Sequence, residues 1–217
     1  MHTREVEELD KEIVTKIDAI VLAAGSSTRM PSANKLLLDT LGELMIQKVI
    51  SQLTNSQINN LIVVIGYEHE QIIDALKDYP DIKFIYNAAF KKGQSFSIKA
   101  AMSMVAEDSD AFMVCLGDMP MISTDDYNLM IDEYDAISQN ISRPIIRPIY
   151  KESIGHPVIF HKSYQDDVLR LASGDDCREV IKSNADNYFK IEVNSINYFF
   201  DIDNDHDYQR LIRYLEK

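Results

Sequence analysis

The sequence has few cysteines and no long hydrophobic run. Its 217 residues include two cysteines, Cys115 and Cys177, which lie far apart in the chain. This pattern favours neither a disulfide framework nor a CxxC metal site, and it fits a reducing compartment. No stretch approaches the run of about 18 apolar residues that indicates a transmembrane helix, and residues 1–16 are acidic and polar, unlike a signal peptide. We therefore expect a cytoplasmic protein.

Basic residues are also scarce relative to acidic ones. The chain has 22 lysines and arginines against 35 aspartates and glutamates, which gives a formal net charge of −13. An excess of this sign disfavours nonspecific binding to nucleic acid or to anionic lipid, so we expect neither partner. An anionic small substrate is still compatible with it, because salt screens exposed charges that lie more than about 10 Å away.

The sequence does contain a regular alternation of short apolar runs and amphipathic segments. Hydrophobic residues make up 46% of the chain, which is enough for a sizeable core. The pattern predicts strands at 17–22, 61–65, 82–86 and 111–116. It predicts helices at 45–53, 68–77, 95–105 and 123–137, the last opened by Ser123 and Asp126 as a capping box. Continuously apolar strands that alternate with helices predict a Rossmann-like α/β fold, a mostly parallel sheet with helices on both faces.

The regular alternation of predicted strands and helices ends after residue 140. Residues 145–150 and 158–160 lie on either side of Gly155-His156-Pro157 and predict an inserted antiparallel β-excursion. Two short helices at 162–171 and 176–183, strands at 188–193 and 197–200, and a helix from Asp205 complete the chain. We predict a single domain over residues 17–217, preceded by an arm or a loose helix over residues 1–16.

Ligands of parallel α/β sheets bind beyond the carboxyl ends of the strands. After the first strand comes the run from Leu22 through Ala24, Gly25 and Ser26 to Arg29, and Lys35 follows. Small residues let the backbone approach a ligand and form an anion-binding nest, while the two cations suit a triphosphate. The P-loop and GxGxxG patterns are absent, and the second absence disfavours a nicotinamide oxidoreductase. The alternative is an ordinary Gly/Ser turn with two solvated cations.

Carboxylates follow two of the predicted strands. Asp118 comes directly after residues 111–116, and Asp201 and Asp203 follow residues 197–200. Mg²⁺ prefers one or two carboxylates together with substrate phosphates, so two of these residues are candidates to share one metal ion. The alternative is capping, in which Asp203 or Asp205 caps the last helix and Asp118 caps a turn.

Two further segments carry candidate residues. Gly93 suits a tight turn, Ser95 suits a helix N-cap, and Lys99 lies one turn into the predicted helix, whose N-terminus attracts anions. His156 precedes Pro157 at the mouth of the β-excursion, where it either donates to a substrate phosphate or shapes a turn.

Together these segments resemble the signatures of the MobA-like NTP transferases, and most closely the molybdenum cofactor cytidylyltransferase (MocA-like) branch. The matching segments occur in the family's order over residues 23–37, 93–99, 116–120, 155–158 and 201–203. The resemblance implies a sheet of the nucleotide-diphospho-sugar transferase type. It also implies transfer of a nucleoside monophosphate from CTP, or from GTP, to the terminal phosphate of the molybdopterin cofactor, with release of pyrophosphate. A molybdenum enzyme is the implied user of the product and a transient partner.

The resemblance also assigns roles to residues. Lys35, Arg29 and Asp118 would be catalytic, Asp118 and Asp203 would bind Mg²⁺ with Asp201 as the substitute, and His156 and Lys99 would face the acceptor. The residues implied in nucleotide binding are Leu22, Ala23, Ala24, Gly25, Ser26, Arg29, Lys35, Gly93, Ser95 and Ser97.

The sequence departs from the family's pattern at three places. Pro31 stands where the family usually has glycine, Lys99 where it usually has arginine, and Asn204-Asp205 where it usually has Thr-Pro. Proline removes an N–H from the phosphate loop, and lysine loses a bidentate contact. Two other functions therefore stay open: a nucleotidyltransferase that acts on a sugar or polyol phosphate, and a non-catalytic protein that binds and delivers a cofactor.

Overall fold

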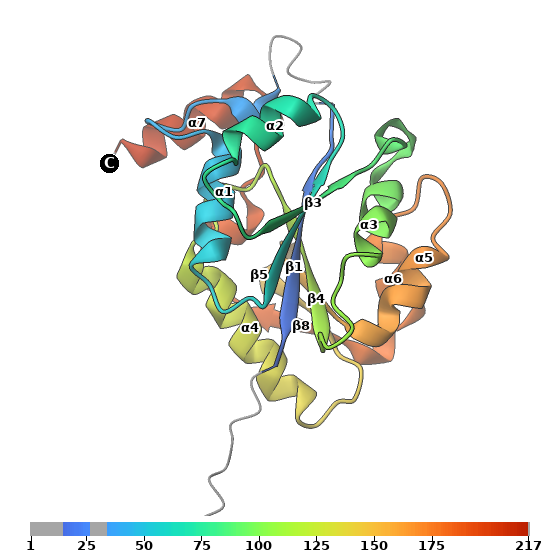
Figure 1. Cartoon of the computed structure of the whole chain (residues 1–217). Coiled ribbons are helices and arrows are strands. Elements are labelled where there is room, and N and C mark those ends of the chain that lie inside the picture. Colours follow the sequence, from blue (N-terminus) through green and yellow to red (C-terminus); the bar gives the residue numbers. More distant parts are fainter. Residues whose placement is uncertain (1–14, 27–33, 217) are drawn as a thin grey trace, which may run out of the picture.

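Eight strands form one sheet at the centre of the structure, in the order β3-β2-β1-β4-β7-β5-β6, with β8 paired to β5. The computed structural model describes residues 15–26 and 34–216 (Figure 1). The strands are β1 (Ile17–Ala23), β2 (Asn60–Ile65), β3 (Ile82–Tyr86), β4 (Ala111–Leu116), β5 (Ile145–Tyr150), β6 (Ser153–Ile154), β7 (Val158–His161) and β8 (Tyr188–Glu192).

The strand directions confirm the predicted fold class. β1 pairs in parallel with β2 and β4, and β2 pairs in parallel with β3. β7 is antiparallel to both β4 and β5, β6 forms a short hairpin with β5, and β8 is parallel to β5. The predicted antiparallel excursion therefore extends the main sheet. Because β1 lies between β2 and β4, the order of the strands reverses at β1, and ligands of such sheets bind beside this point.

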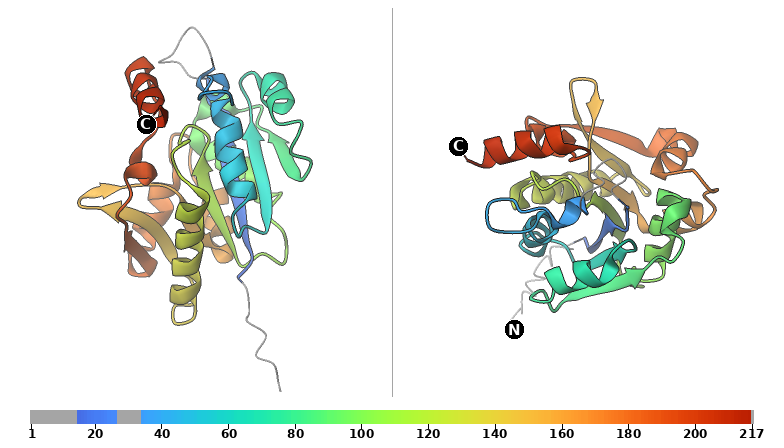
Figure 2. Two further views of the ribbon diagram at one scale, coloured as in Figure 1. Left: turned by 90° about the vertical axis from the view of Figure 1, so that its left-hand side faces the viewer. Right: turned by 90° about the horizontal axis from the view of Figure 1, so that it is seen from above.

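Helices cover both faces of the sheet (Figures 1 and 2). α1 and α4 pack on one face, and α3, α5 and α6 pack on the other. The helices are α1 (Met45–Thr54), α2 (His69–Ala75), α3 (Gln94–Met102), α4 (Thr124–Ser138), α5 (Gln165–Leu169), α6 (Cys177–Ser183) and α7 (Asp205–Leu215). Short 3-10 helices are η1 (Lys35–Leu37), η2 (Phe90–Lys92), η3 (Lys162–Tyr164), η4 (Ala185–Asn187) and η5 (Ile196–Phe199).

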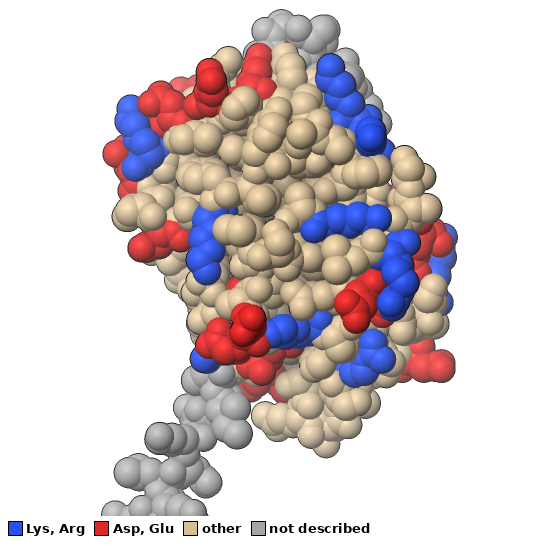
Figure 3. Space-filling view, turned by 45° about the vertical axis from the view of Figure 1, so that its right-hand side comes forward, with Lys and Arg blue, Asp and Glu red and all other residues tan. Residues whose placement is uncertain are grey.

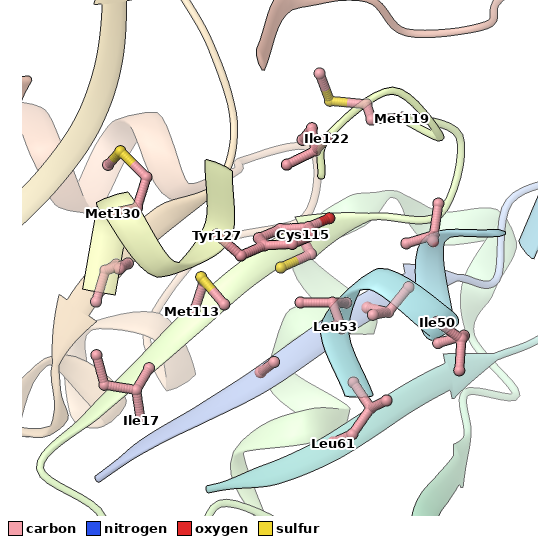
Figure 4. Packing of buried hydrophobic residues seen from close by; sticks show 14 of the residues in the cluster. Ile17, Ile50, Leu53, Leu61, Met113, Cys115, Met119, Ile122, Tyr127 and Met130 are labelled. Carbon is pink, nitrogen blue, oxygen red and sulfur yellow. The ribbon is translucent and has the colours of Figure 1, made fainter. Parts of the chain in front are cut away.

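The two layers of helices explain why the central strands carry apolar residues on both faces. On β1, Ile17 and Val21 face α1 and α4, whereas Ile20 faces α3 on the opposite side. Figure 4 shows the first of these layers, in which Leu53 and Tyr127 pack with residues of the sheet. Burial of a large aliphatic side chain contributes about 1.5–3 kcal/mol, so both faces of the central strands stabilise the fold.

Helix ends match the predicted capping in one case and differ in two. Ser123 and Asp126 form the predicted capping box of α4. Neither Asp203 nor Asp205 caps α7, because Asn204 is the N-cap and accepts a hydrogen bond from the backbone of Asp207. The N-cap prediction for Ser95 was also wrong, as described with the site below.

The predicted strand at 197–200 is also wrong, because η5 occupies this position. Side chains on one face of a strand are two residues apart, but here consecutive residues are both anchored on α4. The Asn197 amide donates to the Asp126 carboxylate at 2.8 Å, and the Tyr198 hydroxyl donates to the Asp126 carbonyl at 2.8 Å. The Ser195 hydroxyl accepts from the backbone of Asn197 and starts the 3-10 turn.

Most of the predicted N-terminal arm lies outside the described residues. The Lys16 ammonium reaches Asp108 at 2.6 Å. Over the part of the chain that the structure describes, no helix combines the length and apolar character needed to cross a bilayer. On the face that Figure 3 presents, lysines and arginines are interspersed with aspartates and glutamates and form no continuous basic area.

Candidate active site

A cavity of about 520 Å³ opens at the carboxyl edge of β1 and β4. The strand order places it beside β1, where the order of the strands reverses. It is lined by the ends of the two strands, by η1, by the start of α3, and by the segment before α7. The lining residues are Leu22, Ala24, Gly25, Ser26, Lys35, Leu36, Phe90, Lys91, Gly93, Gln94, Ser97, Leu116, Asp118, Asp201 and Asp203.

A lysine between two carboxylates occupies the middle of this set. The Lys35 ammonium donates to Asp118 in a very short contact and to Asp203 at 3.2 Å. Lys35 is held by η1, whose N-cap Asn34 accepts from the backbone of Leu36. The backbone of Ile202 donates to the Asp118 carbonyl at 3.0 Å, which attaches the segment before α7 to the end of β4. The Lys35 ammonium group thus binds two carboxylates that lie 83 and 168 positions further along the chain.

The charges of this cluster affect one another. Burial by itself would lower the pKa of Lys35, but the charges and hydrogen bonds of Asp118 and Asp203 outweigh it and raise this pKa above its ordinary value of 10.5. Lys35 is therefore a cation at neutral pH. Burial raises the pKa of Asp201, and the neighbouring carboxylates Asp203 and Asp118 add to that shift. The cavity thus has three carboxylates around one lysine, an arrangement that favours an added cation.

The donor set fits a divalent metal of the Mg²⁺ type. The Oδ1 atom of Asp118 is buried and has no hydrogen-bond partner among the described residues, which is costly for a carboxylate oxygen unless a ligand binds it. Carboxylate oxygens are the ligands that Mg²⁺ and Mn²⁺ prefer. Within residues 15–26 and 34–216, no three acidic, histidine or cysteine side chains make up a complete metal site, so substrate phosphates would have to complete it.

The turn after β1 lies where the sequence places it. Leu22, Ala24, Gly25 and Ser26 line the cavity, whereas Ala23 faces the core on the α1 side of the sheet. A Cβ atom on Gly25 would have no described residue within 4 Å. Arg29 and Pro31 lie outside the described residues, and the role of Arg29 stays a prediction.

The start of α3 differs from the prediction. Gly93, with φ of 116°, is the N-cap, a conformation that suits glycine. Ser95 is buried inside the first turn, where its hydroxyl donates to the Ala172 carbonyl at 3.2 Å, and it does not line the cavity. Ser97 lines the cavity and accepts from the Asn87 amide at 3.0 Å. Lys99 points elsewhere and donates to the Leu171 carbonyl.

Sequence reasoning missed two residues that line the cavity and one glycine beside its walls. Phe90 and Lys91 line it from η2. Gly66 follows β2, and a Cβ atom there would lie 2.9 Å from the carbonyl of Ala24 and 2.9 Å from the Cβ of Phe90. Gly66 therefore lets these two walls approach each other. The position of Gly66 directly after a buried strand was the signal that could have identified it.

His156 does not line the cavity. Its backbone N–H donates to the Tyr198 carbonyl at 3.0 Å, and its Nε2 atom is 3.5 Å from the Arg147 guanidinium. Arg147 also donates twice to the Gly155 carbonyl. Burial, followed by the positive charge of Arg147, lowers the pKa of His156 to about 4. The imidazole is therefore neutral at physiological pH. The expectation that His156 faces the acceptor substrate stays a prediction.

The comparison with protein families matches this cavity and this sheet. The model of the MobA-like NTP transferase domain matches residues 19–188. The chain belongs to this family. The match runs from β1 into the first residue of β8, so it includes Lys35 and Asp118 but ends before Asp201 and Asp203. At the level of the family, the protein is thus a nucleotidyltransferase, and the family named from the sequence is confirmed.

Similar proteins support the same fold. The bifunctional protein GlmU of Lactococcus lactis is 27% identical over 184 residues, which are 84% of this chain and 38% of that protein. The chain spans about a quarter to two-fifths of the first curated relatives that it matches. The crystal structure of Rv0371c from Mycobacterium tuberculosis has a TM-score of 0.78 at 22% identity, over 92% of this chain and 99% of that one.

Two further solved structures have the same fold. A complex of Rv0371c with manganese matches with a TM-score of 0.75 at 21% identity, over 92% of this chain and 99% of that one. Molybdopterin-guanine dinucleotide biosynthesis protein A from Archaeoglobus fulgidus matches with a TM-score of 0.64 at 18% identity, over 92% of this chain and 98% of that one. At these identities the matches establish the fold.

Proposed function

We propose that this protein transfers CMP from CTP to a phosphorylated acceptor, the molybdopterin cofactor, and releases pyrophosphate. The observation that supports this best is the Lys35 cation held between Asp118 and Asp203 in the cavity beside the turn after β1. The resemblance to the MocA-like branch supports the donor and the acceptor. The structural match to a molybdopterin dinucleotide biosynthesis protein supports the acceptor class.

The reaction needs no nucleophile from the protein, because a phosphate oxygen of the acceptor attacks the α-phosphorus of the nucleotide. The protein has to bring two anions together and stabilise the charge that they share. The turn at Ala24, Gly25 and Ser26 allows the backbone to approach the nucleotide. Lys35 supplies a fixed positive charge to a phosphate oxygen, since its ammonium group is already oriented by two carboxylates. Arg29 is the predicted second cation.

Asp118 and Asp203 are the residues that would hold a divalent cation, with Asp201 as the alternative second ligand. When bound, such a cation would neutralise phosphate charge and orient the triphosphate. The unpaired oxygen of Asp118 and the absence of nitrogen or sulfur donors in this set favour Mg²⁺ or Mn²⁺ over softer metals. Mg²⁺ is the ion that we propose.

Thermal unfolding with each nucleotide tests the donor. We expect CTP with Mg²⁺ to raise Tm more than GTP, ATP or UTP does. A ligand at 100 times its Kd stabilises the fold by roughly 2.7 kcal/mol, which corresponds to about 5–10 °C for a domain of this size. Asp118→Asn should remove the Mg²⁺-dependent part of the shift. The matched control is Asp205→Asn, because Asp205 is exposed at the start of α7 and does not line the cavity.

Pyrophosphate release with different acceptors tests the second substrate. Release with the molybdopterin cofactor supports the proposal, whereas release only with a sugar or polyol phosphate identifies the alternative transferase. If no nucleotide raises Tm and no acceptor supports turnover, the protein is a binding or delivery module rather than an enzyme.

A further inference from the structure

A second cavity, of about 320 Å³, adjoins the candidate active site. Asp201 lines both cavities. The walls of the second cavity come from the turn of the β5–β6 hairpin, from η5 and from α7. Figure 2 shows this hairpin projecting from the sheet on the same side as α7. A molecule whose reacting phosphate lies beside Lys35 therefore has a neighbouring space for the rest of its body.

Two positively charged side chains line this second cavity. Lys151 lies in the hairpin turn, and Arg210 lies on α7. The Lys151 ammonium is 5.1 Å from the centre of the Tyr150 ring, and the Arg210 guanidinium carbon is 4.7 Å from the centre of the Phe200 ring. A cation over an aromatic face is held by the ring's negative potential. Such contacts reduce the side-chain entropy that binding of an anion would cost.

Ion pairing within the protein leaves much of this positive charge available. Arg210 has one carboxylate partner among the described residues, Asp207, at the long distance of 3.9 Å. Asp207 also accepts from the backbone N–H of Asp203 at 3.3 Å. Lys151 forms no ion pair with any residue that the structure describes. Two carboxylates, Asp201 and Asp207, also line this cavity. Asp207 is engaged by Arg210 and by the Asp203 N–H, and Asp201 belongs to the carboxylate cluster around Lys35.

We propose that this second cavity binds an anionic group on the body of the acceptor, separate from the phosphate that reacts. The inference depends on the proposed function, because it takes the acceptor phosphate to lie beside Lys35 and Asp118. Lys151, from the hairpin turn, and Arg210, from α7, are the residues that bind the second anion. The acceptor is then a molecule with at least two anionic groups, and a phosphorylated neutral sugar would leave both cations without a ligand.

Inorganic phosphate is the probe for this subsite, titrated at constant ionic strength into the full-length protein labelled with ¹⁵N. The Arg210 Nε–H resonance, assigned by its loss in Arg210→Gln, reports binding locally. We expect saturable movement of this resonance in the wild type. Phosphate affinity should fall about tenfold in Lys151→Gln, the loss expected when one charge-assisted hydrogen bond is removed.

Arg213→Gln is the matched control. Arg213 lies on the same helix, one turn further along, and does not line this cavity. It should leave phosphate affinity unchanged, and circular dichroism and Tm verify that each variant folds. For Arg210→Gln, affinity is read from backbone resonances of the hairpin and should also fall about tenfold.

The titration is run with and without Mg²⁺ and CTP, so that the two proposals fail separately. If the nucleotide does not bind, the proposed donor is wrong, but the movement of the Arg210 resonance with phosphate still tests the anion site. If phosphate does not move this resonance, or if Arg213→Gln weakens phosphate binding as much as Lys151→Gln does, the second subsite is refuted, whatever the nucleotide does.

Discussion

Replacement of Lys35 by methionine removes the positive charge from the centre of the candidate site with little change in side-chain length. Lys35 and Asp118 have side chains that are 15% and 19% exposed, and Asp203 is 37% exposed. The variant leaves these two carboxylates facing each other in a mostly buried setting without their shared ammonium group. We expect both the stability of the fold and nucleotide transfer to fall.

The stability loss can be bounded from these exposures. Removal of one partner from a buried charge pair costs about 2–5 kcal/mol, and the exposure of Asp203 places this case near the lower end, about 2–3 kcal/mol. For a domain of this size that is a fall in Tm of roughly 4–12 °C. Because the folded-state pKa of Lys35 is raised above 10.5, the contribution is complete at neutral pH and is lost as the pH rises through that raised value. Added Mg²⁺ should restore part of the loss.

The assay is urea unfolding at neutral pH, with turnover measured on the folded fraction. Lys48→Met is the matched control, because Lys48 is also a partly buried lysine, 21% exposed, that pairs with one carboxylate, Glu43, at 2.9 Å. It should cost about 0–1 kcal/mol and leave turnover unchanged. Equal losses in the two variants, or wild-type turnover in Lys35→Met, would refute the role assigned to Lys35.

Three further predictions follow from the packing. Gly66→Ala should destabilise the fold by about 1–3 kcal/mol in urea unfolding, because its Cβ meets backbone at 2.9 Å. Gly25→Ala, whose Cβ meets none of the described residues within 4 Å, should not. Because burial holds the pKa of His156 at about 4, wild-type stability should fall between pH 6.5 and 4 by up to about 1.4 kcal/mol per pH unit, as the unfolded state alone takes up the proton. His156→Gln should flatten that slope, and an unchanged slope would contradict the burial argument. Asn204→Ala should lower Tm by about 2–4 °C in a circular dichroism melt, the loss of one helix cap, and no shift would show that the cap contributes nothing.

Much of the fold could be predicted from local patterns. The continuous apolar run at 111–116 coincides with β4, and the run at 82–86 coincides with β3. β4 is apolar along its whole length, β3 is interrupted by Lys83 alone, and the residues that flank both strands are polar or glycine. The capping box of α4 was equally readable, because both of its partners lie within one turn of the chain.

Two of the errors have the same physical cause, which is that contacts with distant residues outweighed local preference. Ser95 is a good N-cap residue by type, but the Ala172 carbonyl binds its hydroxyl and Gly93 takes the cap position. Residues 197–200 are strand-like by composition, but α4 holds two consecutive side chains and imposes a 3-10 turn. Neither the Ala172 carbonyl nor α4 lies close enough along the chain to be part of a local sequence pattern.

The sequence by itself determined the order of elements, the parallel sheet, the family and the chemical types at the candidate site, because these depend on periodicity and on residues adjacent in the chain. Tertiary structure decided which of those residues meet. It placed Lys35 between Asp118 and Asp203, left His156 and Lys99 outside the cavity, and joined a second cavity to the first at Asp201. The physical reason is that an ion pair across 168 positions of sequence forms only when the sheet and the Ile202–Asp118 backbone hydrogen bond bring the two segments together.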